Sequence, residues 1–453
     1  MMMDVMEMEL TRNSDSTAVR SLIRPLRTRI HLIDVLSIAD GEARVFWQNG
    51  RLTTAYAGWG VTASVTASGA GRFAQVRQEV ERLLSCVDNE SAPRDASPRM
   101  FGGFAFRPDY VPHQTWFEFP NTYFVLPRVM VTDTDGQLWL TITTCDANED
   151  LVAEADRIVS RLESAGDVER FAQPHVVRTT YPLSLDDWRD QVNEGVSRIR
   201  AGELEKVVLA RTADLEFDGP ISVVPALARL GARYPATYRF MIEPSKGSAF
   251  LGATPELLIE VSDGRVRTAA VAGSIARGLT DREDAELAAQ LFTSVKERHE
   301  HALVANSLHD LLEPMASQLV YPDEPQIMKL SNIQHLYTPF DGVLKSHLDV
   351  LDAVGTLHPT PALGGCPQQV AVNTIREIER VDRGWFASPV GWIDGCGNGM
   401  LAVAIRSAVV YEETARLYAG CGIVEQSDPD SEWEETRIKF RPMLDAFGAE
   451  LQQ

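Results

Sequence analysis

The sequence is poor in cysteine and in long apolar runs. Its 453 residues include five cysteines, an odd number, which are widely spaced and form no C-x-x-C pair. This spacing disfavours a disulfide framework and a structural zinc site, and it favours a reducing cytoplasm. No run of about 18 apolar residues occurs, so we expect no transmembrane helix. Residues 1–17 lack the basic start and apolar core of a signal peptide, and we expect them to be disordered or extended.

Positive charge is also scarce. Acidic residues outnumber basic ones by 64 to 43, which gives a formal net charge of -21. We therefore expect no nucleic acid or anionic membrane as a partner, because both carry negative charge. Any anionic ligand must find a local basic pocket. With 44% hydrophobic residues, the chain is able to bury a large core.

Strand-like and helix-like segments do not alternate regularly along the chain. Short β-branched and aromatic runs with turns between them predominate from residue 30 to residue 144. Later strand patterns cover residues 206–211, 250–261, 265–271, 400–411 and 416–420, and helical patterns cover residues 281–312, 350–357, 370–383 and 431–447. We predict an α+β fold with large antiparallel β-sheets flanked by helices, rather than a Rossmann or barrel repeat.

The last helical pattern carries three charged residues on one side. At about 100° per residue, Glu432, Glu435 and Lys439 fall within roughly 60° of one another, apart from an apolar stripe. A solvated Glu–Lys pair four residues apart is the simplest explanation, and a binding site is the alternative. Pro442 can change the helical phase beyond it. The pattern alone leaves both interpretations open.

The helical pattern around Glu300 resembles a metal site. Its histidines, His299 and His301, are two residues apart and so point in different directions, which disfavours zinc. Carboxylate oxygens from separate helices suit Mg2+, which keeps several waters and needs only one or two protein carboxylates. Taken singly, Glu300 fits a surface position.

A lysine and two glycine-rich segments lie in strand-like surroundings. Lys206 begins an apolar strand pattern, where one face should be buried. A buried lysine needs a partner or must lose its proton, and a neutral lysine can serve as a general base. Residues 395–399 and 420–422 suit either a hairpin or the close approach of a ligand to the backbone. Spacing does not choose between these alternatives.

An ordered set of motifs resembles the chorismate-utilising enzymes and, within them, the isochorismate synthases. The resemblance is strong from residue 184 to residue 447 and looser before it, where F-G-G-F-A-F at 101–106 is similar to a strand of the family. The motifs are E-K-V-V-L-A-R at 205–211, F-L-G-A-T-P-E-L-L at 250–258, A-G-S at 272–274, R-H-E-H at 298–301, Q-H-L at 334–336, H-P-T-P-A at 358–362, A-I-R at 404–406, Y-A-G-C-G-I-V at 418–424 and residues 427–439.

The resemblance implies the chorismate-utilising fold, with an active site in a cleft between two subdomains. We expect a β-rich N-terminal subdomain at residues 18–182 and a chorismate-binding catalytic region at residues 183–453. By resemblance, Lys206 is the general base that activates water and Glu256 is the general acid that protonates the departing hydroxyl. The family pattern assigns Mg2+ to Glu300 and Glu435, with Glu432 nearby. It assigns substrate binding to His335, Ala362, Leu363, Arg406, Gly420, Gly422 and Lys439.

The lysine also separates this chain from relatives of the same fold. Anthranilate and aminodeoxychorismate synthases use ammonia, and anthranilate synthases typically carry glutamine where this chain has Lys206. We therefore expect water as the nucleophile and no obligate glutaminase subunit. Salicylate synthases keep the lysine, but their segment at the position of residues 358–365 usually differs. An inactive binding homologue would have lost the acid, the base or a metal carboxylate, and all are present.

The pathway is read less directly from the sequence. Isochorismate feeds menaquinone, siderophore and salicylate synthesis, and the strand that contains Gly102 and Gly103 favours the menaquinone type. We expect a monomeric, cytoplasmic isomerase.

Overall fold

The computed structural model describes residues 7–8, 19–28, 30–50, 54–84, 92–164, 173–330 and 333–450. The start that we expected to be extended, residues 1–17, lies outside the described residues except for strand β1 (Glu7–Met8). Two large sheets form the framework, and every strand pairing in the described chain is antiparallel. The predicted fold class is confirmed.

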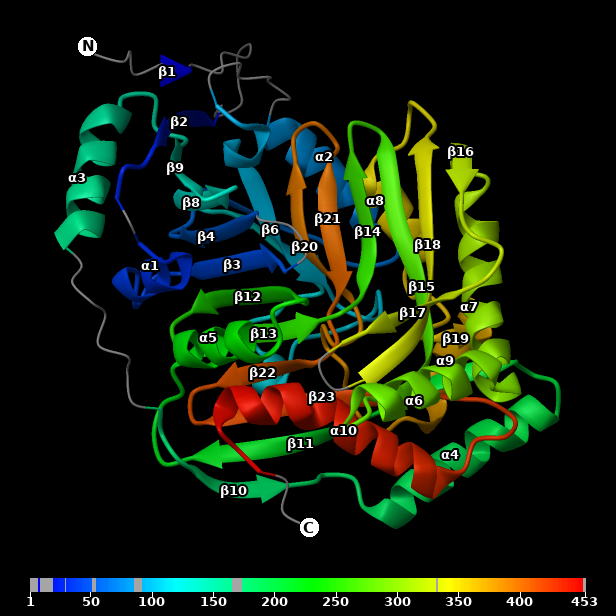
Figure 1. The fold of residues 1–453 in the computed structure, drawn as a ribbon. Helices are drawn as coiled ribbons and strands as arrows, with labels where there is room; N and C mark the ends of the chain where they lie inside the picture. Colours follow the sequence, from blue (N-terminus) through cyan, green and yellow to red (C-terminus); the bar gives the residue numbers. More distant parts are fainter. Residues whose placement is uncertain are drawn as a thin grey trace.

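The first sheet has 13 strands within the described ranges and runs from top to bottom of Figure 1. In spatial order its strands are β1, β2 (Arg20–Pro25), β9 (Gln137–Thr144), β8 (Val129–Thr134), β4 (Ala55–Trp59), β3 (Arg44–Asn49), β12 (Tyr238–Ser245), β13 (Ser248–Thr254), β22 (Ser407–Tyr411), β23 (Thr414–Ile423), β11 (Lys206–Phe217) and β10 (Val176–Thr180), with β19 (Gly365–Cys366) also paired to β11.

The second sheet has ten strands in the same described ranges, and many of them stand upright on the right of Figure 1, across the direction of the first sheet. Its order is β16 (Ala316–Val320), β18 (Ile333–Leu344), β15 (Arg265–Ala276), β14 (Leu257–Ser262), β21 (Gly399–Val403), β20 (Pro389–Asp394), β6 (Arg99–Phe104), β7 (Thr122–Leu126) and β5 (Ala63–Thr66), with β17 (Gln326–Lys329) paired to β18.

Both sheets contain strands from before and after residue 182. In the first sheet β3 pairs with β12, and in the second sheet β6 pairs with β20. One hydrophobic core joins side chains of both sheets, among them Phe101, Phe250 and Trp385. The two parts of the sequence are therefore continuous in hydrogen bonding and in packing.

The chain crosses from one sheet to the other at two adjacent places, which we call the sheet crossings (residues 254–257 and 403–407). The strand pattern at residues 250–261 is split into β13 and β14, and the pattern at residues 400–411 is split into β21 and β22. Our prediction of one continuous strand in each range is wrong. Pro255 has no N–H to continue a ladder, and Arg406 has a left-handed backbone with φ 51°.

The two sheet crossings are tied to each other by backbone hydrogen bonds. The Ala253 N–H donates to the Arg406 carbonyl at 3.1 Å, and the Val403 N–H donates to the Glu256 carbonyl at 3.0 Å. Glu256 and Arg406 are thereby placed side by side where the sheets meet.

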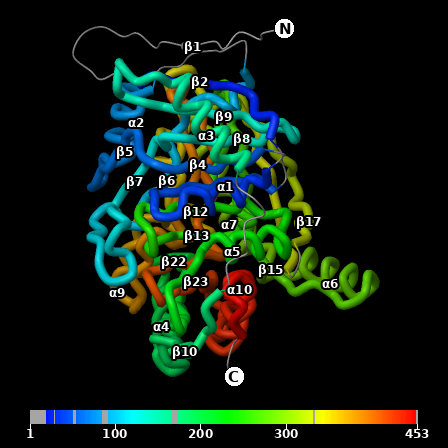
Figure 2. Tube along the Cα trace, turned by 90° about the vertical axis from the view of Figure 1, so that its left-hand side faces the viewer, coloured from blue at the N-terminus to red at the C-terminus, as the bar shows by residue number. Residues whose placement is uncertain are grey.

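Helices cover the outer faces of the sheets (Figures 1 and 2). Their bounds are α1 (Leu32–Ile38), α2 (Arg72–Leu83), α3 (Leu151–Ser164), α4 (Leu185–Arg200), α5 (Val223–Arg233), α6 (Asp281–Thr293), α7 (Val295–Leu312), α8 (Val350–Leu357), α9 (Gln368–Ile378) and α10 (Pro429–Phe447). The single helix predicted at residues 281–312 is two helices, because Ser294 ends α6 and caps α7 through its hydroxyl. Figure 2 shows α6 projecting from the body.

Helix α10 has the two faces that its sequence predicts. Asp428 caps its start, Gly448 ends it with φ 70°, and Pro442 is accommodated inside it. Phe440 and Leu444 are buried in a second core between the first sheet and the helices that cover it. The opposite face, with Glu432, Glu435 and Lys439, is available to the region where the sheets meet.

Cysteine usage departs from the sequence expectation at one position. Cys396, in the turn between β20 and β21, is disulfide-bonded, whereas Cys145, Cys366 and Cys421 are free. Wide spacing in sequence does not exclude a bond, because the fold brings distant segments together. Within the described chain, no helix has the length and apolar character needed to cross a membrane.

Candidate active site

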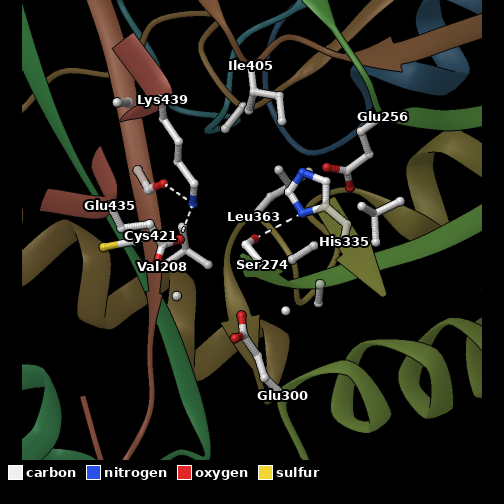
Figure 3. Close-up of a pocket in the computed structure, with 18 of the residues that line it drawn as sticks. Val208, Glu256, Ser274, Glu300, His335, Leu363, Ile405, Cys421, Glu435 and Lys439 are labelled. Carbon is white, nitrogen blue, oxygen red and sulfur yellow. Dashed lines mark hydrogen bonds and ion pairs between the residues drawn. The ribbon is translucent and has the colours of Figure 1, made fainter. Parts of the chain in front are cut away.

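A pocket of about 90 Å3 lies where the two sheets meet, with α7 and α10 along its walls. Figure 3 shows Glu256 on one wall, Lys439 on another and Glu300 rising from below, with His335 between them. Cationic and anionic side chains both reach into it.

Lys206 and Glu300 form an ion pair at the base of the pocket. Lys206 is the first residue of β11 and only 1% exposed, and its Nζ lies 2.8 Å from Oε1 of Glu300 on α7. Gly422 on the neighbouring strand β23 makes room for this contact. A Cβ at position 422 would lie 2.7 Å from Glu300 Oε1 and 2.7 Å from Lys206 Cε. The pair therefore needs glycine opposite it.

Glu256 and Arg406 lie on the two sheet crossings, and both are buried. Burial raises the pKa of the Glu256 carboxyl to about 7, although Arg406, Lys206 and Lys439 act in the opposite direction. Burial also lowers the pKa of the Arg406 guanidinium to about 10, which still leaves it charged at neutral pH. Glu256 can thus carry a proton near pH 7 beside a fixed positive charge.

His335 on β18 lies opposite Ser274 on β15. The Ser274 hydroxyl and His335 Nδ1 are 2.9 Å apart (Figure 3), and His335 Nε2 is buried without a hydrogen-bond partner. Burial lowers the pKa of His335 to about 3, with Arg406 and Lys439 adding to the effect. The ring is therefore neutral, and its second nitrogen is available to a ligand.

Lys439 and Glu435 lie one turn apart on α10. Lys439 Nζ is 2.6 Å from Glu435 Oε1 and donates to the Gly420 carbonyl at 2.9 Å (Figure 3). Burial disfavours both charges, but the pair outweighs it: the pKa of Glu435 is lowered and the pKa of Lys439 is raised. Both groups are therefore charged at neutral pH.

A third lysine joins the carboxylates of α7 and α10. Lys296 Nζ lies 3.5 Å from Glu432 Oε1 and 4.0 Å from Glu297 Oε1. The Glu432 side chain is 2% exposed, and its Oε1 has no hydrogen-bond partner. Burial, with the neighbouring Glu435, raises the pKa of Glu432, and burial with Glu300 raises the pKa of Glu297. One ammonium thus serves a buried carboxyl group, Glu432, and a half-buried one, Glu297.

The last wall is the turn that follows α8. Ala362 and Leu363 line the pocket, and the N–H groups of Leu363 and Gly364 both donate to the Thr360 carbonyl at 2.9 Å. Arg383 fixes the turn from behind by donating to the Leu363 carbonyl at 3.0 Å. The pocket wall is therefore rigid backbone at this point.

Comparison with known families decides what kind of pocket this is. The family described as "Chorismate binding enzyme" matches residues 6–448. The chain belongs to this family. The resemblance inferred from the motifs is confirmed.

Two curated relatives are similar in sequence over most of their length. The isochorismate synthase MenF of Bacillus subtilis is 37% identical over 90% of this chain and 88% of its own. The salicylate biosynthesis isochorismate synthase of Pseudomonas aeruginosa is 34% identical over 89% of this chain and 85% of its own.

Solved structures agree with the fold of this chorismate-binding enzyme. The menaquinone-specific isochorismate synthase MenF of Escherichia coli superposes with TM-score 0.80 and 25% identity, covering 95% of this chain and 94% of its own. Component I of the anthranilate synthase of Streptococcus pneumoniae superposes with TM-score 0.71 over 98% of this chain and 95% of its own. At 18% identity, the second likeness concerns the fold alone.

The structure of this chorismate-binding enzyme brings the predicted residues together, with one exception. Glu432 is not among the residues that line the pocket; it lies behind Lys296, its side chain almost fully buried. The predicted residues that do line the pocket are Lys206, Glu256, Glu300, His335, Ala362, Leu363, Arg406, Gly420, Gly422, Glu435 and Lys439.

Several lining residues were not among the sequence predictions, and three of them are polar or charged residues of β15 and α7. Ser274, Lys296 and Glu297 line the pocket. The Ser274 N–H donates a hydrogen bond to the Glu297 carboxylate at 2.9 Å. Gly273, with φ 76°, makes the bulge that turns Ser274 toward His335. A usable signal was the spacing of Glu297 and Glu300, three residues apart and so on one helix face.

The carboxylates of α7 and α10 are the only predicted metal donors. Within the described ranges, no three His, Cys, Asp or Glu side chains converge closely enough to hold a metal ion. The donor chemistry nevertheless fits Mg2+, because carboxylate oxygens are its preferred ligands and Glu432 leaves one buried oxygen without a hydrogen bond. Three lysines pair with the four carboxyl groups. A cation that displaced the lysines would find oxygen ligands on two separate helices.

Proposed function

We propose that this chorismate-binding enzyme is an isochorismate synthase, an isomerase that converts chorismate to isochorismate reversibly. The observation that carries the proposal is a buried lysine and a buried carboxyl of raised pKa in one pocket, Lys206 and Glu256. Water addition at one ring carbon with loss of hydroxyl at another needs a base and an acid at separate positions.

The two residues divide the proton transfers between them. Lys206 takes a proton from the water that adds at C2 of chorismate. The double bond shifts as the C4 hydroxyl leaves, and Glu256 gives that hydroxyl its proton, so a second water departs. One water enters and one leaves, and the net reaction is an isomerisation.

The positively charged side chains of the pocket bind the dianionic substrate. Arg406 and Lys439 receive the side-chain carboxylate, together with the backbone around Gly420 and Gly422. The neutral ring of His335, with the turn at Ala362 and Leu363, lies along the substrate ring. These positive charges meet the need for a local basic pocket in a chain of net charge -21.

We assign Mg2+ to Glu300 and Glu435, with Glu432 nearby, because Mg2+ prefers carboxylate oxygens. A bound Mg2+ would supply positive charge for the ring carboxylate of chorismate. The assignment is supported by the orphaned oxygen of Glu432 and by the two helices that present the carboxylates.

A product analysis tests the reaction. Purified protein is incubated with chorismate and Mg2+, and the products are separated by chromatography. Isochorismate is the expected product. Salicylate with pyruvate would indicate a salicylate synthase, anthranilate formed with ammonia would indicate the amine branch, and no turnover would indicate an inactive homologue.

We propose menaquinone synthesis as the pathway, over siderophore and salicylate synthesis. The strand β6 with Gly102 and Gly103 and the similarity to two enzymes named MenF support this choice. Growth of a bacterial strain that lacks its menaquinone-specific enzyme should be restored by this chain, and restoration only of a siderophore-deficient strain would contradict it.

We further propose a monomer in the cytoplasm that needs no glutaminase subunit, nucleic acid or membrane. Three free thiols agree with a reducing compartment, whereas the disulfide at Cys396 is more typical of an oxidising one. We propose that residues 18–182 form a subdomain and residues 183–453 the catalytic region. The described residues that line the active-site pocket all fall between residues 206 and 439. Light scattering on the purified protein tests the monomer.

A further inference from the structure

A second, small cavity shares Glu256 with the active-site pocket. Its volume is about 10 Å3, and most of its wall is apolar, formed by Leu257 and Leu258 of β14 and by Val304 and Leu308 of α7. Thr268 and Thr360 contribute the only hydroxyl groups among its described lining residues. Glu256 therefore borders both spaces, and we call its side toward the small cavity the closed side.

Thr360 presents an unused hydroxyl to this closed side. The residue is 7% exposed, and its Oγ1 is buried without a hydrogen-bond partner. Its carbonyl is already occupied, because it accepts from the N–H groups of Leu363 and Gly364. A buried hydroxyl without a partner is unfavourable, so a group that completes its hydrogen bonding stabilises the folded protein.

The Glu256 carboxyl group also has unused hydrogen-bonding capacity. Of the residues that the structure describes, none donates a hydrogen bond to its carboxyl group, and its backbone N–H and carbonyl are used by Thr254 and Val403. The charged groups that act on the carboxyl are Arg406, Lys206 and Lys439, which lie on the active-site side. The closed side contributes no charge.

The cavity matches one water molecule. A buried water needs roughly 10–15 Å3 of such space and two to four polar partners. Three partners are at hand: the Thr360 hydroxyl, the Glu256 carboxyl and the Thr268 hydroxyl, which donates to the Leu258 carbonyl at 2.6 Å and can still accept.

We propose that Thr360 is a positioning residue for Glu256, acting through one water held in this cavity. The water donates to the carboxyl oxygen on the closed side, so the carboxyl proton is held on the other oxygen, toward the substrate. The same hydrogen bond stabilises the carboxylate that remains after the proton has left. The inference rests on the proposed function, in which Glu256 is the general acid.

Thr360 thus links two parts of the site. Its carbonyl holds the turn that places Ala362 and Leu363 against the substrate, and its hydroxyl reaches the far side of the acid. A residue that only shaped the turn would need its backbone and not its hydroxyl.

The test uses two substitutions that separate the hydroxyl from the shape. Thr360→Val keeps the volume and removes the hydroxyl, whereas Thr360→Ser keeps the hydroxyl. For Thr360→Val we expect kcat to fall about tenfold with KM within about twofold of the original, because only proton transfer is affected. The alkaline limb of kcat/KM should move up by about half a pH unit, because the carboxylate loses a donor. Thr360→Ser should restore both quantities.

Thr356→Val is the matched control. The Thr356 hydroxyl donates to the Asp352 carbonyl within α8. Thr356 precedes Thr360 by four residues and does not line the cavity beside Glu256. We expect its kcat and pH profile to equal those of the unaltered protein.

Failure of this inference is distinguishable from failure of the proposed function. An active Glu256→Gln variant would remove Glu256 from the acid role and with it the proposed function. If Glu256→Gln is inactive while Thr360→Val keeps the original kcat and alkaline limb, only the role of Thr360 is overturned. A crystal structure of the unaltered protein gives a readout independent of variant folding: a water bound to Thr360 and Glu256 supports the proposal, and an empty cavity overturns it.

Discussion

The amino group of Lys206 lies 2.8 Å from Oε1 of Glu300, in a space that exists because residue 422 has no side chain. The proposed base and a proposed metal ligand thus share one contact. In the proposed reaction the two would separate, since Lys206 would accept a proton and Glu300 would offer its oxygen to a cation.

Lys206→Ala should lose nearly all turnover and still bind chorismate. Removing a general base costs about 100-fold to 10,000-fold in rate, whereas Arg406 and Lys439 remain to hold the substrate. Turnover is measured by chromatography and binding by calorimetry. Lys246→Ala, at an exposed lysine paired with Asp40, serves as control. Retained turnover would remove Lys206 from the base role.

Glu435→Gln should raise the Mg2+ concentration needed for half-maximal activity by roughly tenfold or more, because an amide oxygen carries no charge. The matched control is Glu434→Gln on the same helix, whose carboxylate is 61% exposed and pairs with Arg437. A Mg2+ titration of both variants gives the comparison. Superimposable titrations for Glu435→Gln and the unaltered protein would count against a ligand role.

The activity should decline at alkaline pH because of Glu256. Its pKa is raised to about 7 by burial, so the carboxyl keeps its proton below that pH and loses it above. Only the protonated form can act as an acid, and kcat/KM should therefore fall as the pH rises through about 7. A profile of kcat/KM from about pH 5.5 to about pH 9 measures this limb. A flat profile across this range would show that Glu256 does not donate the proton.

Gly422→Ala should damage activity more than stability. The added Cβ meets the mobile ends of Glu300 and Lys206, which can move aside at small cost in folding but lose their contact. We expect at least about a tenfold loss of kcat/KM with a small change in melting temperature. Gly219→Ala is the control, since its nearest neighbour, Pro174, is 3.9 Å away. Equal activity of both variants would contradict the need for glycine.

Lys296→Met should strengthen binding of divalent cations. Lys296 lies near the carboxylates of Glu432 and Glu297, where it competes with a metal for the same oxygens. Removing the competing charge should lower the Kd for Mn2+, followed by electron paramagnetic resonance, about threefold to tenfold. Lys345→Met, an exposed lysine bonded to the Pro314 carbonyl, should leave the Kd unchanged. Weaker binding in Lys296→Met would instead make Lys296 a support of the metal site.

The charged face of the last helix could be predicted from sequence because it depends on local geometry. A period of 3.6 residues fixes which side chains share a face, so Glu432, Glu435 and Lys439 were expected together, and α10 places them so despite Pro442. The same spacing could not say that Glu432 would lie behind Lys296, because that depends on how α7 packs against α10.

The sheet crossings could not be predicted, because they are a tertiary feature. The runs at residues 250–261 and 400–411 have strand composition throughout, and only the pairing partners show that each run belongs to two sheets. The cavity between Glu256 and Thr360 has the same origin, since it joins residues that are distant in sequence. The catalytic roles proposed for Lys206 and Glu256 come from family resemblance and not from spacing.

The sheet crossings also mean that the positions of Glu256 and Arg406 both depend on how the two sheets pack together. Glu256 and Arg406 are each held by one strand from either sheet, so the angle between the sheets sets their separation. A substitution deep in the core that tilts one sheet against the other would alter the alignment of a proton donor with its substrate, without touching the pocket. Core side chains that set the angle between the sheets therefore also affect the proposed proton transfer. We expect substitutions of distant core residues to change kcat while the affinity for substrate stays the same.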